Sequence, residues 1–430
     1  MTAFAINRPR RRGACPGLSA PMPTGDGLLV RLLPIGTIPL AAFAHLCAAA
    51  RLYGNGIVEV TGRGSIQVRG LNAGSAPRFA DAIAALNIAA EDGVSVLSNA
   101  LAGLDAEEIL DANALATDLR RALSRTSLTA RLAAKVSVAI DGGGALSLAN
   151  VSADVRLCAE ATARGARLRV GLAGDQGSAT QVGAIAPADG VEAVSRLLEV
   201  IAQRGRTARA RDVLAVAGEA PFRTALAGLL IENVTPFGSR NTADLIGSHR
   251  LRDGSLACGV GVAFGHAEAT TLERLAEAAS AAGAIGIRIG ADRVLMLIGL
   301  RQATASTFVN AAERLGFIVA PDDPRRRIVA CAGAPICSSA HIAARALAPR
   351  IAGIAVAHLD GARQIHISGC AKGCAHAGNA ALTIVGSPDG CALIANGSAR
   401  DISLAVIATD ELPVAVERYF HATAREDGHV

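Results

Sequence analysis

The sequence predicts an α+β protein made of two similar halves, each a small unit followed by a larger one. At 430 residues the chain exceeds the size at which one hydrophobic core usually keeps growing. Residues 28–71 read as a strand, a turn, an amphipathic helix and a second strand. The same order of elements returns without a gap 229 positions later, in residues 257–300. A duplicated chain with two to four structural units is therefore expected.

The internal repeat is marked by identical residues at matching positions. The matches are Gly36 with Gly265, Leu46 with Leu275, Ala49 and Ala50 with Ala278 and Ala279, Gly54 with Gly283, and Gly70 and Leu71 with Gly299 and Leu300. Chance identity is the alternative in a chain rich in Ala, Gly and Leu, but the shared order of elements favours duplication. Because duplicated halves commonly meet face to face, we expect a cleft between them, lined by arginines from both.

The predicted boundaries follow from the repeat and from Pro and Gly punctuation. We expect the small units at residues 19–85 and 251–318, the larger regions at 90–212 and 325–425, and a weakly periodic connector at 213–250. Residues 133–151, "AAKVSVAIDGGGALSLANV", are predicted to form a β-hairpin in the first larger region.

The composition favours binding of a small acidic molecule. Hydrophobic residues make up 51% of the chain and aromatic residues 3%, with no Trp, so a stacking surface for nucleic acid is not expected. The net charge of +5 comes almost wholly from arginine, because Lys135 and Lys372 are the only lysines. Arginine favours bidentate binding of carboxylate or phosphate groups.

The sequence predicts a cytoplasmic protein that does not enter a membrane. No apolar run reaches the roughly 18 residues needed to span a bilayer. The N-terminal Arg cluster is followed by Pro and Gly instead of the apolar segment of a signal peptide. Since the cytoplasm keeps thiols reduced, the nine cysteines indicate metal binding better than a disulfide framework.

Four cysteines form two pairs with the spacing of metal ligands. Cys331 and Cys337 make a C-x5-C pair, and Cys370 and Cys374 a C-x3-C pair. Structural zinc sites prefer tighter pairs, whereas iron–sulfur clusters take cysteines from more widely spaced loops. An iron–sulfur cluster is therefore favoured, with zinc and unliganded thiols as alternatives. The cysteines without a partner at such spacing are Cys15, Cys47, Cys158, Cys258 and Cys391.

Longer motifs carry a family resemblance. The order "RLLPIG", "YGNGIVEVTGRGSIQVRGL", "CAGAPIC" and "HISGCAKGC" resembles the ferredoxin-dependent nitrite and sulfite reductase superfamily, over about Cys15 to Asn396. Within it, "RRGACPGLSAPMPTGDGLLVRL", "DGGG" and "GCAKGCAH" more closely resemble the precorrin-3B synthase family. The resemblance implies a duplicated nitrite/sulfite reductase-like fold, in which two ferredoxin-like half-domains and two larger α/β domains are related by pseudo-two-fold symmetry.

The resemblance also implies a reaction and its cofactors. The expected activity is a monooxygenase step of aerobic cobalamin biosynthesis, in which precorrin-3A is hydroxylated at C-20 and forms a γ-lactone. Cys331, Cys337, Cys370 and Cys374 would hold a 4Fe–4S cluster, a separate mononuclear iron is expected, and sirohaem is not. The substrates are the tetrapyrrole and O2. Electrons would come from a separate NADH-linked reductase or ferredoxin, because "GVGVAFG", at Gly259–Gly265, lacks the context of a dinucleotide site.

The superfamily's basic residues are matched only in part. Arg31, Arg63 and Lys135 fall on its anion-binding motif positions. Arg69, Arg288 and Arg293 are further substrate-binding candidates if they face the cleft. Ser137 stands where the reductases carry a second lysine, and the "RN" expected before "VLS" is absent from "GVSVLSN". Because those cations would hold sulfite or nitrite, reduction of an inorganic anion is not expected.

The roles of the residues near the cysteines stay open. His366, His376 and His341 are candidates either for ligands of the mononuclear iron or for donors to the cluster. Lys372 would stabilise a reduced cluster or a bound carboxylate, with a solvated surface charge as the alternative. A sirohaem-dependent nitrite or sulfite reductase and a non-catalytic iron–sulfur sensor are the alternative functions, and no catalytic side chain is predicted.

Overall fold

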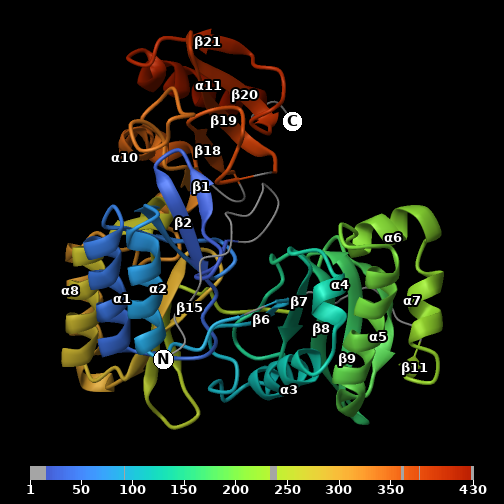
Figure 1. The fold of residues 1–430 in the computed structure, drawn as a ribbon. Helices are drawn as coiled ribbons and strands as arrows, with labels where there is room; N and C mark the ends of the chain where they lie inside the picture. The colour runs from blue at the N-terminus through green and yellow to red at the C-terminus, as the bar shows by residue number, and fades with distance from the viewer. Residues whose placement is uncertain (1–15, 92, 233–239, 360–362, 377, 428–430) are drawn as a thin grey trace.

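The computed structural model describes residues 16–91, 93–232, 240–359, 363–376 and 378–427. Its strands form four sheets, two of five strands at the centre and one in each of the two larger domains. Figure 1 shows the first larger domain beside the central sheets and the second above them. No helix among the described residues is long and apolar enough to cross a membrane.

The first small unit is a five-stranded sheet covered on one face by helices. Its strands, in spatial order, are β1 (Met22–Thr24), β2 (Gly27–Leu32), β5 (Ile66–Leu71), β4 (Ile57–Val60) and β14 (His266–Glu268), and its helices are α1 (Leu40–Tyr53) and α2 (Ser75–Ala85). The second small unit repeats this order with β12 (Gly247–Arg250), β13 (Leu256–Gly261), β16 (Val294–Leu300), β15 (Gly286–Ile289) and β3 (Ile38–Pro39), and with α8 (Ala269–Ala281) and α9 (Ala305–Arg314). The predicted duplication is therefore confirmed.

The two small units exchange a strand. β3 follows β2 of the first small unit in the chain, but it pairs with β15 of the second small unit. In return, β14 of the second small unit pairs with β4 of the first small unit. The registers correspond, because Ile38 lies opposite Ile287 and Ala267 lies opposite Val58. Both partner pairs are related by the 229-residue shift seen in the sequence. The exchange was not predicted, and it joins the units along an approximate two-fold axis.

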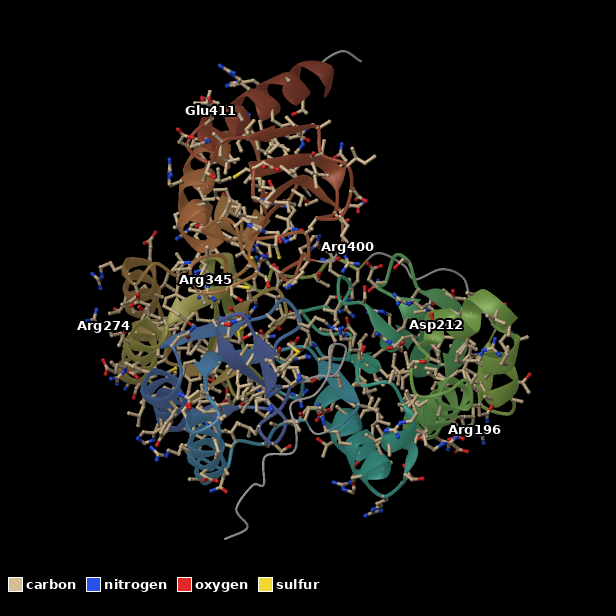
Figure 2. All side chains as sticks on the ribbon, turned by 45° about the horizontal axis from the view of Figure 1, so that its top comes forward. Arg196, Asp212, Arg274, Arg345, Arg400 and Glu411 are labelled. Atoms are coloured by element: carbon tan, nitrogen blue, oxygen red, sulfur yellow. The ribbon has the colours of Figure 1, made fainter. Side chains whose placement is uncertain are left out.

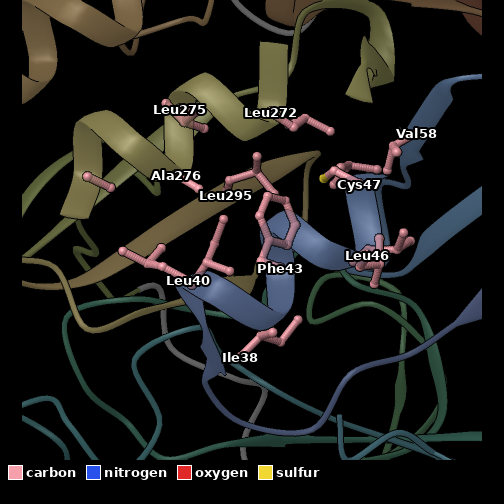
Figure 3. Close-up of a cluster of buried hydrophobic side chains, with 14 of the residues drawn as sticks. Ile38, Leu40, Phe43, Leu46, Cys47, Val58, Leu272, Leu275, Ala276 and Leu295 are labelled. Carbon is pink, nitrogen blue, oxygen red and sulfur yellow. The ribbon is translucent and has the colours of Figure 1, made fainter. Parts of the chain in front are cut away.

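One continuous core fills the space between the two small units. Phe43 of α1 is 1% exposed and lies among side chains of α8 and β16, including Leu272 and Leu295 (Figure 3). α1 presents Leu46 and Cys47 to the same core, which agrees with the apolar positions of its sequence. The two halves therefore share apolar surface, and neither small unit has a core of its own.

The two larger domains repeat one topology. The first has the sheet order β11 (Leu230–Glu232), β10 (Thr180–Ile185), β9 (Gly165–Gly174), β8 (Ala153–Thr162), β7 (Ser137–Asp141) and β6 (Ser95–Ser98), with α3 (Ala112–Ser124), α4 (Leu128–Arg131), α5 (Gly190–Gln203), α6 (Ala210–Ala217) and α7 (Ala220–Ala225). The second has β17 (Ile328–Ala330), β18 (Ile365–Ser368), β19 (Ala380–Ser387), β20 (Gly390–Gly397) and β21 (Ala405–Ile407), with α10 (Ala344–Ala355) and α11 (Leu412–Asp427). In each sheet the first three strands in chain order are parallel and the later ones antiparallel.

Two sequence predictions need comment here. The hairpin over residues 133–151 is wrong: β7 pairs in parallel with β6 and β8, and the DGGG segment leads into a loop instead of a tight turn. The connector at 213–250 contains α7 and β11, which belong to the first larger domain, and β12, which belongs to the second small unit. The predicted domain boundaries otherwise stay predictions.

Candidate functional site

The four predicted metal ligands lie on loops at one edge of the second larger domain. Cys331 directly follows β17, and Cys370 follows β18 by two residues. Because these strands are parallel, their carboxyl ends meet at the same edge of the sheet. The Cys331 amide donates to the Ile367 carbonyl at 3.1 Å, and the Gly369 amide donates to the Cys331 Sγ at 3.0 Å.

The charges of the four thiols act on one another. Burial raises the pKa of Cys331, amides of Gly369 and Gly333 oppose that shift, and Cys374 and Cys370 add to it. Burial likewise raises the pKa of Cys374, with Cys370 and Cys337 acting in the same direction. All four cysteines carry free thiols. Four thiols that repel one another's negative charge need a bound cation to ionise together.

The donor set fits a polynuclear centre better than a single ion. An iron–sulfur cluster takes one cysteine for each of its irons, so four thiols from two loops suit such a centre. Gly369 leaves no room for a side chain, since a Cβ there would lie 2.6 Å from the Ala340 Cβ. This close approach directs a backbone amide at a cysteine sulfur, as cluster sites require.

The histidines near the cysteines do not form one metal site. His366 lies on β18 and is 0% exposed, and neither ring nitrogen has a hydrogen-bond partner in the described part of the chain. Its ring meets that of His376 edge-on at 5.7 Å between centroids. Burial and, to a smaller extent, the charge of His376 lower the pKa of His366 to about 4. His341 is exposed.

Lys372 connects the two cysteine loops. Its Nζ donates to the Ser339 Oγ at 2.6 Å, so the side chain spans from the Cys370–Cys374 loop to the Cys331–Cys337 loop. Its charge also acts to lower the pKa of Cys374. The side chain is nevertheless exposed, so both the role at the cysteines and that of a surface charge stay open.

Two of the predicted arginines line a cavity between the central sheets and the first larger domain. The cavity opens to solvent, and its wall includes Arg63 and Arg288. Arg63 donates to the Ser137 Oγ at 2.8 Å and to the Ser152 carbonyl at 3.1 Å. Arg288 donates to the Thr37 Oγ1 at 2.8 Å and to the Ala102 carbonyl at 2.8 Å. One guanidinium thus comes from each half.

The other predicted basic residues lie elsewhere. Arg31 donates to the Ser65 Oγ at 2.9 Å, and Lys135 is exposed just before β7. Arg69 forms an ion pair with Asp26 beside the cysteine loops. Arg293 is 8% exposed and donates to the carbonyls of Ile328 and Arg326, which suits a structural role and not a substrate contact.

The structure adds residues that the sequence reasoning missed. Asn99 and Arg120 line the same cavity. Asn99 accepts the Leu101 amide at 2.9 Å, while its amide nitrogen is buried without a partner among the described residues. Arg120 is paired with Glu91 at 2.9 Å. Asn99 could have been predicted from the string "VLSN", because it directly follows the parallel strand β6. Ligands commonly bind beyond the carboxyl ends of parallel strands.

An ionic contact joins the second larger domain to the first small unit. Arg345, just inside the start of α10, pairs with Glu59 of β4, and both side chains are less than one fifth exposed. Figure 2 shows Arg345 where the C-terminal domain meets the central sheets. His266 of β14 lies opposite Glu59 in the sheet. Burial and, to a smaller extent, the Arg345 charge lower the pKa of His266 to about 4.

We expect His266 to make the stability of the protein fall in mild acid. The unfolded chain protonates this ring near pH 6.5, whereas the folded chain keeps it neutral down to about pH 4. Stability is therefore fully present above pH 6.5 and falls by about 2 kcal/mol on acidification to pH 5. In thermal melts at pH 7 and pH 5, His266→Gln should lose less stability than the wild type. The exposed His45→Gln is the control, and an unchanged slope in His266→Gln would refute the assignment.

Known proteins share this architecture. The family model described as "Nitrite/Sulfite reductase ferredoxin-like half domain" matches residues 20–86. The solved structure of the Mycobacterium tuberculosis NirA protein superposes with a TM-score of 0.75 at 21% identity, over 92% of this chain and 80% of that one. This likeness shows the nitrite/sulfite reductase-like fold that the sequence predicted.

Two curated relatives differ in how much they share with this chain. A sulfite reductase [ferredoxin] of Mycobacterium tuberculosis is 27% identical over 34% of this chain and 28% of its own length. A precorrin-3B synthase of Sinorhizobium sp is 39% identical over 402 residues, which are 93% of this chain and 86% of that protein. This chain therefore belongs to the precorrin-3B synthase family.

Proposed function

We propose that this chain is an oxygen-dependent precorrin-3B synthase, which hydroxylates precorrin-3A at C-20 and closes a γ-lactone from the ring A acetate. The observation that carries the proposal is the 39% identity over 93% of the chain. The arrangement of the site supports it, since four cysteines gather at one sheet edge and arginines from both halves line a cavity.

The proposed cofactor is a 4Fe–4S cluster held by Cys331, Cys337, Cys370 and Cys374. Such a cluster supplies single electrons. The Gly369 amide at Cys331 and the Lys372 charge near Cys374 would stabilise the more negative, reduced state. Among the described residues, no group of three or more His, Cys, Asp or Glu side chains is arranged to hold a mononuclear iron.

The proposed substrate contacts start with Arg63 and Arg288. A tetrapyrrole with several carboxylates suits guanidinium groups that are held in place by other hydrogen bonds and approach from opposite halves. Ser137 accepts a hydrogen bond from Arg63 at 2.8 Å, so this position holds an arginine in place and supplies no cation for a small anion. Arg31 and Lys135 remain candidates for binding tetrapyrrole carboxylates that lie outside the cavity of Arg63 and Arg288. Fixing the macrocycle in this way would leave one carbon in position to react.

The proposal is tested on anaerobically purified protein. We expect broad visible absorption of a cluster, iron in excess of acid-labile sulfide, no tetrapyrrole bands, and conversion of precorrin-3A that requires O2. Incorporation of ¹⁸O from labelled O2 at C-20 would identify the monooxygenase reaction. Sharp bands of bound sirohaem with sulfite or nitrite reduction would move the protein to the reductases. A cluster without any conversion would favour an iron–sulfur sensor.

Loss of the Arg63 charge should weaken binding of the tetrapyrrole. Arg63→Gln removes a charge-assisted hydrogen bond to a carboxylate, which corresponds to roughly a ten- to hundredfold loss of affinity. The measurement is an anaerobic titration with precorrin-3A followed by absorption, so that no turnover occurs. Arg78→Gln, on the exposed side of α2, is the matched control. Equal affinities for the two variants would remove Arg63 from the binding site.

A further inference from the structure

The turn between β1 and β2 packs directly against one cysteine loop. It comprises Thr24–Gly27 of the "PTGDG" string, for which the proposed function gives no role. The Ser338 amide donates to the Gly25 carbonyl at 3.3 Å. A Cβ at Gly25 would lie 2.4 Å from the Ser338 nitrogen and 2.8 Å from the Cys337 Sγ. Only glycine allows the turn to come this close.

An ion pair fixes the turn to the first sheet. The Asp26 carboxylate accepts from Arg69 Nε at 3.0 Å and from Arg69 Nη2 at 3.0 Å, and it also accepts the Thr24 hydroxyl at 2.7 Å. The two side chains are 6% and 13% exposed. Burial opposes ionisation, yet the bonds from Arg69 and Thr24 lower the pKa of Asp26 below its usual value. The carboxylate is therefore charged and locked at neutral pH.

Arg69 belongs to this arrangement and not to the substrate cavity. Its second contact is Glu59, at 3.8 Å. Its charge interacts with Cys337 and acts to lower the pKa of Cys374. It does not line the cavity of Arg63 and Arg288. Arg69 thus faces the cysteines from the side where the turn lies.

The cysteines themselves are unequally covered. Cys337, beneath the turn, is half-buried, whereas Cys374 is exposed. We propose that the Thr24–Gly27 turn is a cover over the Cys337 side of the cluster, held shut by the Asp26–Arg69 pair, and that it keeps dissolved oxygen off that side. This inference rests on the proposed function, because an enzyme that consumes O2 has to bring oxygen close to a cluster that oxygen destroys. Asp26 and Arg69 are positioning residues on this view.

The test is the rate at which the cluster's visible absorption is lost, measured in air and under argon at one temperature. Gly25→Ala pushes the turn away from Cys337, and Asp26→Asn keeps the shape of the side chain but removes the ion pair. We expect either variant to lose its cluster several-fold faster than the wild type in air and at the wild-type rate under argon. Gly17→Ala is the matched control, because a Cβ at Gly17 meets nothing within 4 Å.

Each of the following outcomes would overturn the inference. Wild-type rates in air for both variants would show that the turn covers nothing. Equal acceleration in air and under argon would indicate general destabilisation instead of loss of a cover. A wild-type protein without acid-labile sulfide would sink the proposed function and this inference together, whereas variants that resist oxygen in a cluster-bearing protein would sink the inference alone.

Discussion

Cys370→Ala is expected to abolish both the bound cluster and the activity. The residue lies near the start of the loop after β18, and its charge acts on both Cys331 and Cys374. If the proposed ligand set is right, an alanine there would leave one iron of the cluster without a protein ligand and would remove one negative charge from the site. Iron and acid-labile sulfide should fall to background, and the broad visible absorption should disappear with them.

The matched control for this variant is Cys391→Ser in the same domain. Cys391 is buried on β20, and its Sγ contacts the Thr409 Oγ1 at 3.6 Å, away from the four thiols. Serine keeps the hydrogen bond, so this variant should retain iron and sulfide at the wild-type ratio. If Cys370→Ala kept that ratio as well, the proposed ligand set would be wrong.

Much of the fold was readable because repetition leaves a record in the positions of identical residues. The 229-residue shift predicted the equivalence of α1 and α8, which begin at matching positions. The strand exchange was not readable, because β3 and β14 are two and three residues long. An alternation of buried and exposed residues needs at least four positions to be recognised. Pairing between distant segments also leaves no local signal.

The failed hairpin prediction has a similar physical cause. A glycine-rich segment between two apolar runs is typical of a hairpin turn, and residues 133–151 have that pattern. In the structure the three glycines pack against the segment before α3, and a Cβ at Gly142 would lie 2.2 Å from the Glu108 Oε1. The glycines serve close approach of two loops, which the sequence does not distinguish from a turn.

The sequence was more informative about the cysteines of the candidate site than about its arginines. Cysteines at metal spacing are rare enough that their pattern alone indicated a shared centre, and in the structure the charges of these thiols act on one another. The ligand set itself stays a prediction. Arginine is common in this chain, and its position does not show whether it points to solvent, to a ligand or to a carbonyl. Arg293, predicted to bind substrate, donates to backbone carbonyls, whereas Arg288 reaches the cavity wall.

Arg156 is a buried arginine that supports the cavity wall through hydrogen bonds to backbone carbonyls. It is 0% exposed on β8, and its guanidinium donates to the Leu148 carbonyl from both Nη atoms at 3.1 Å and to the Val151 carbonyl. Leu148 and Val151 line the cavity. The next residue, Ser152, accepts from Arg63. Arg156 therefore holds the wall on which a proposed substrate-binding arginine rests.

Arg156→Met is expected to destabilise the first larger domain by about 3 kcal/mol, because two buried carbonyls lose a charged donor that nothing replaces. Arg156→Lys should cost less, since a single ammonium keeps the charge but cannot fork between the carbonyls. Because the chain has no Trp, unfolding is best followed by far-UV circular dichroism, with hydrogen exchange of the β8 and β9 amides as the local measurement.

Loss of this wall should also weaken tetrapyrrole binding, since Arg63 loses a fixed acceptor at Ser152 even though its own side chain is unchanged. Arg164→Met, in the exposed turn between β8 and β9, removes the same charge from the same hairpin without touching buried carbonyls. It should melt and bind like the wild type. Arg156→Met with wild-type exchange rates in β8 would mean that other contacts hold the cavity wall, whereas faster exchange with unchanged affinity would separate the stability of this domain from substrate binding.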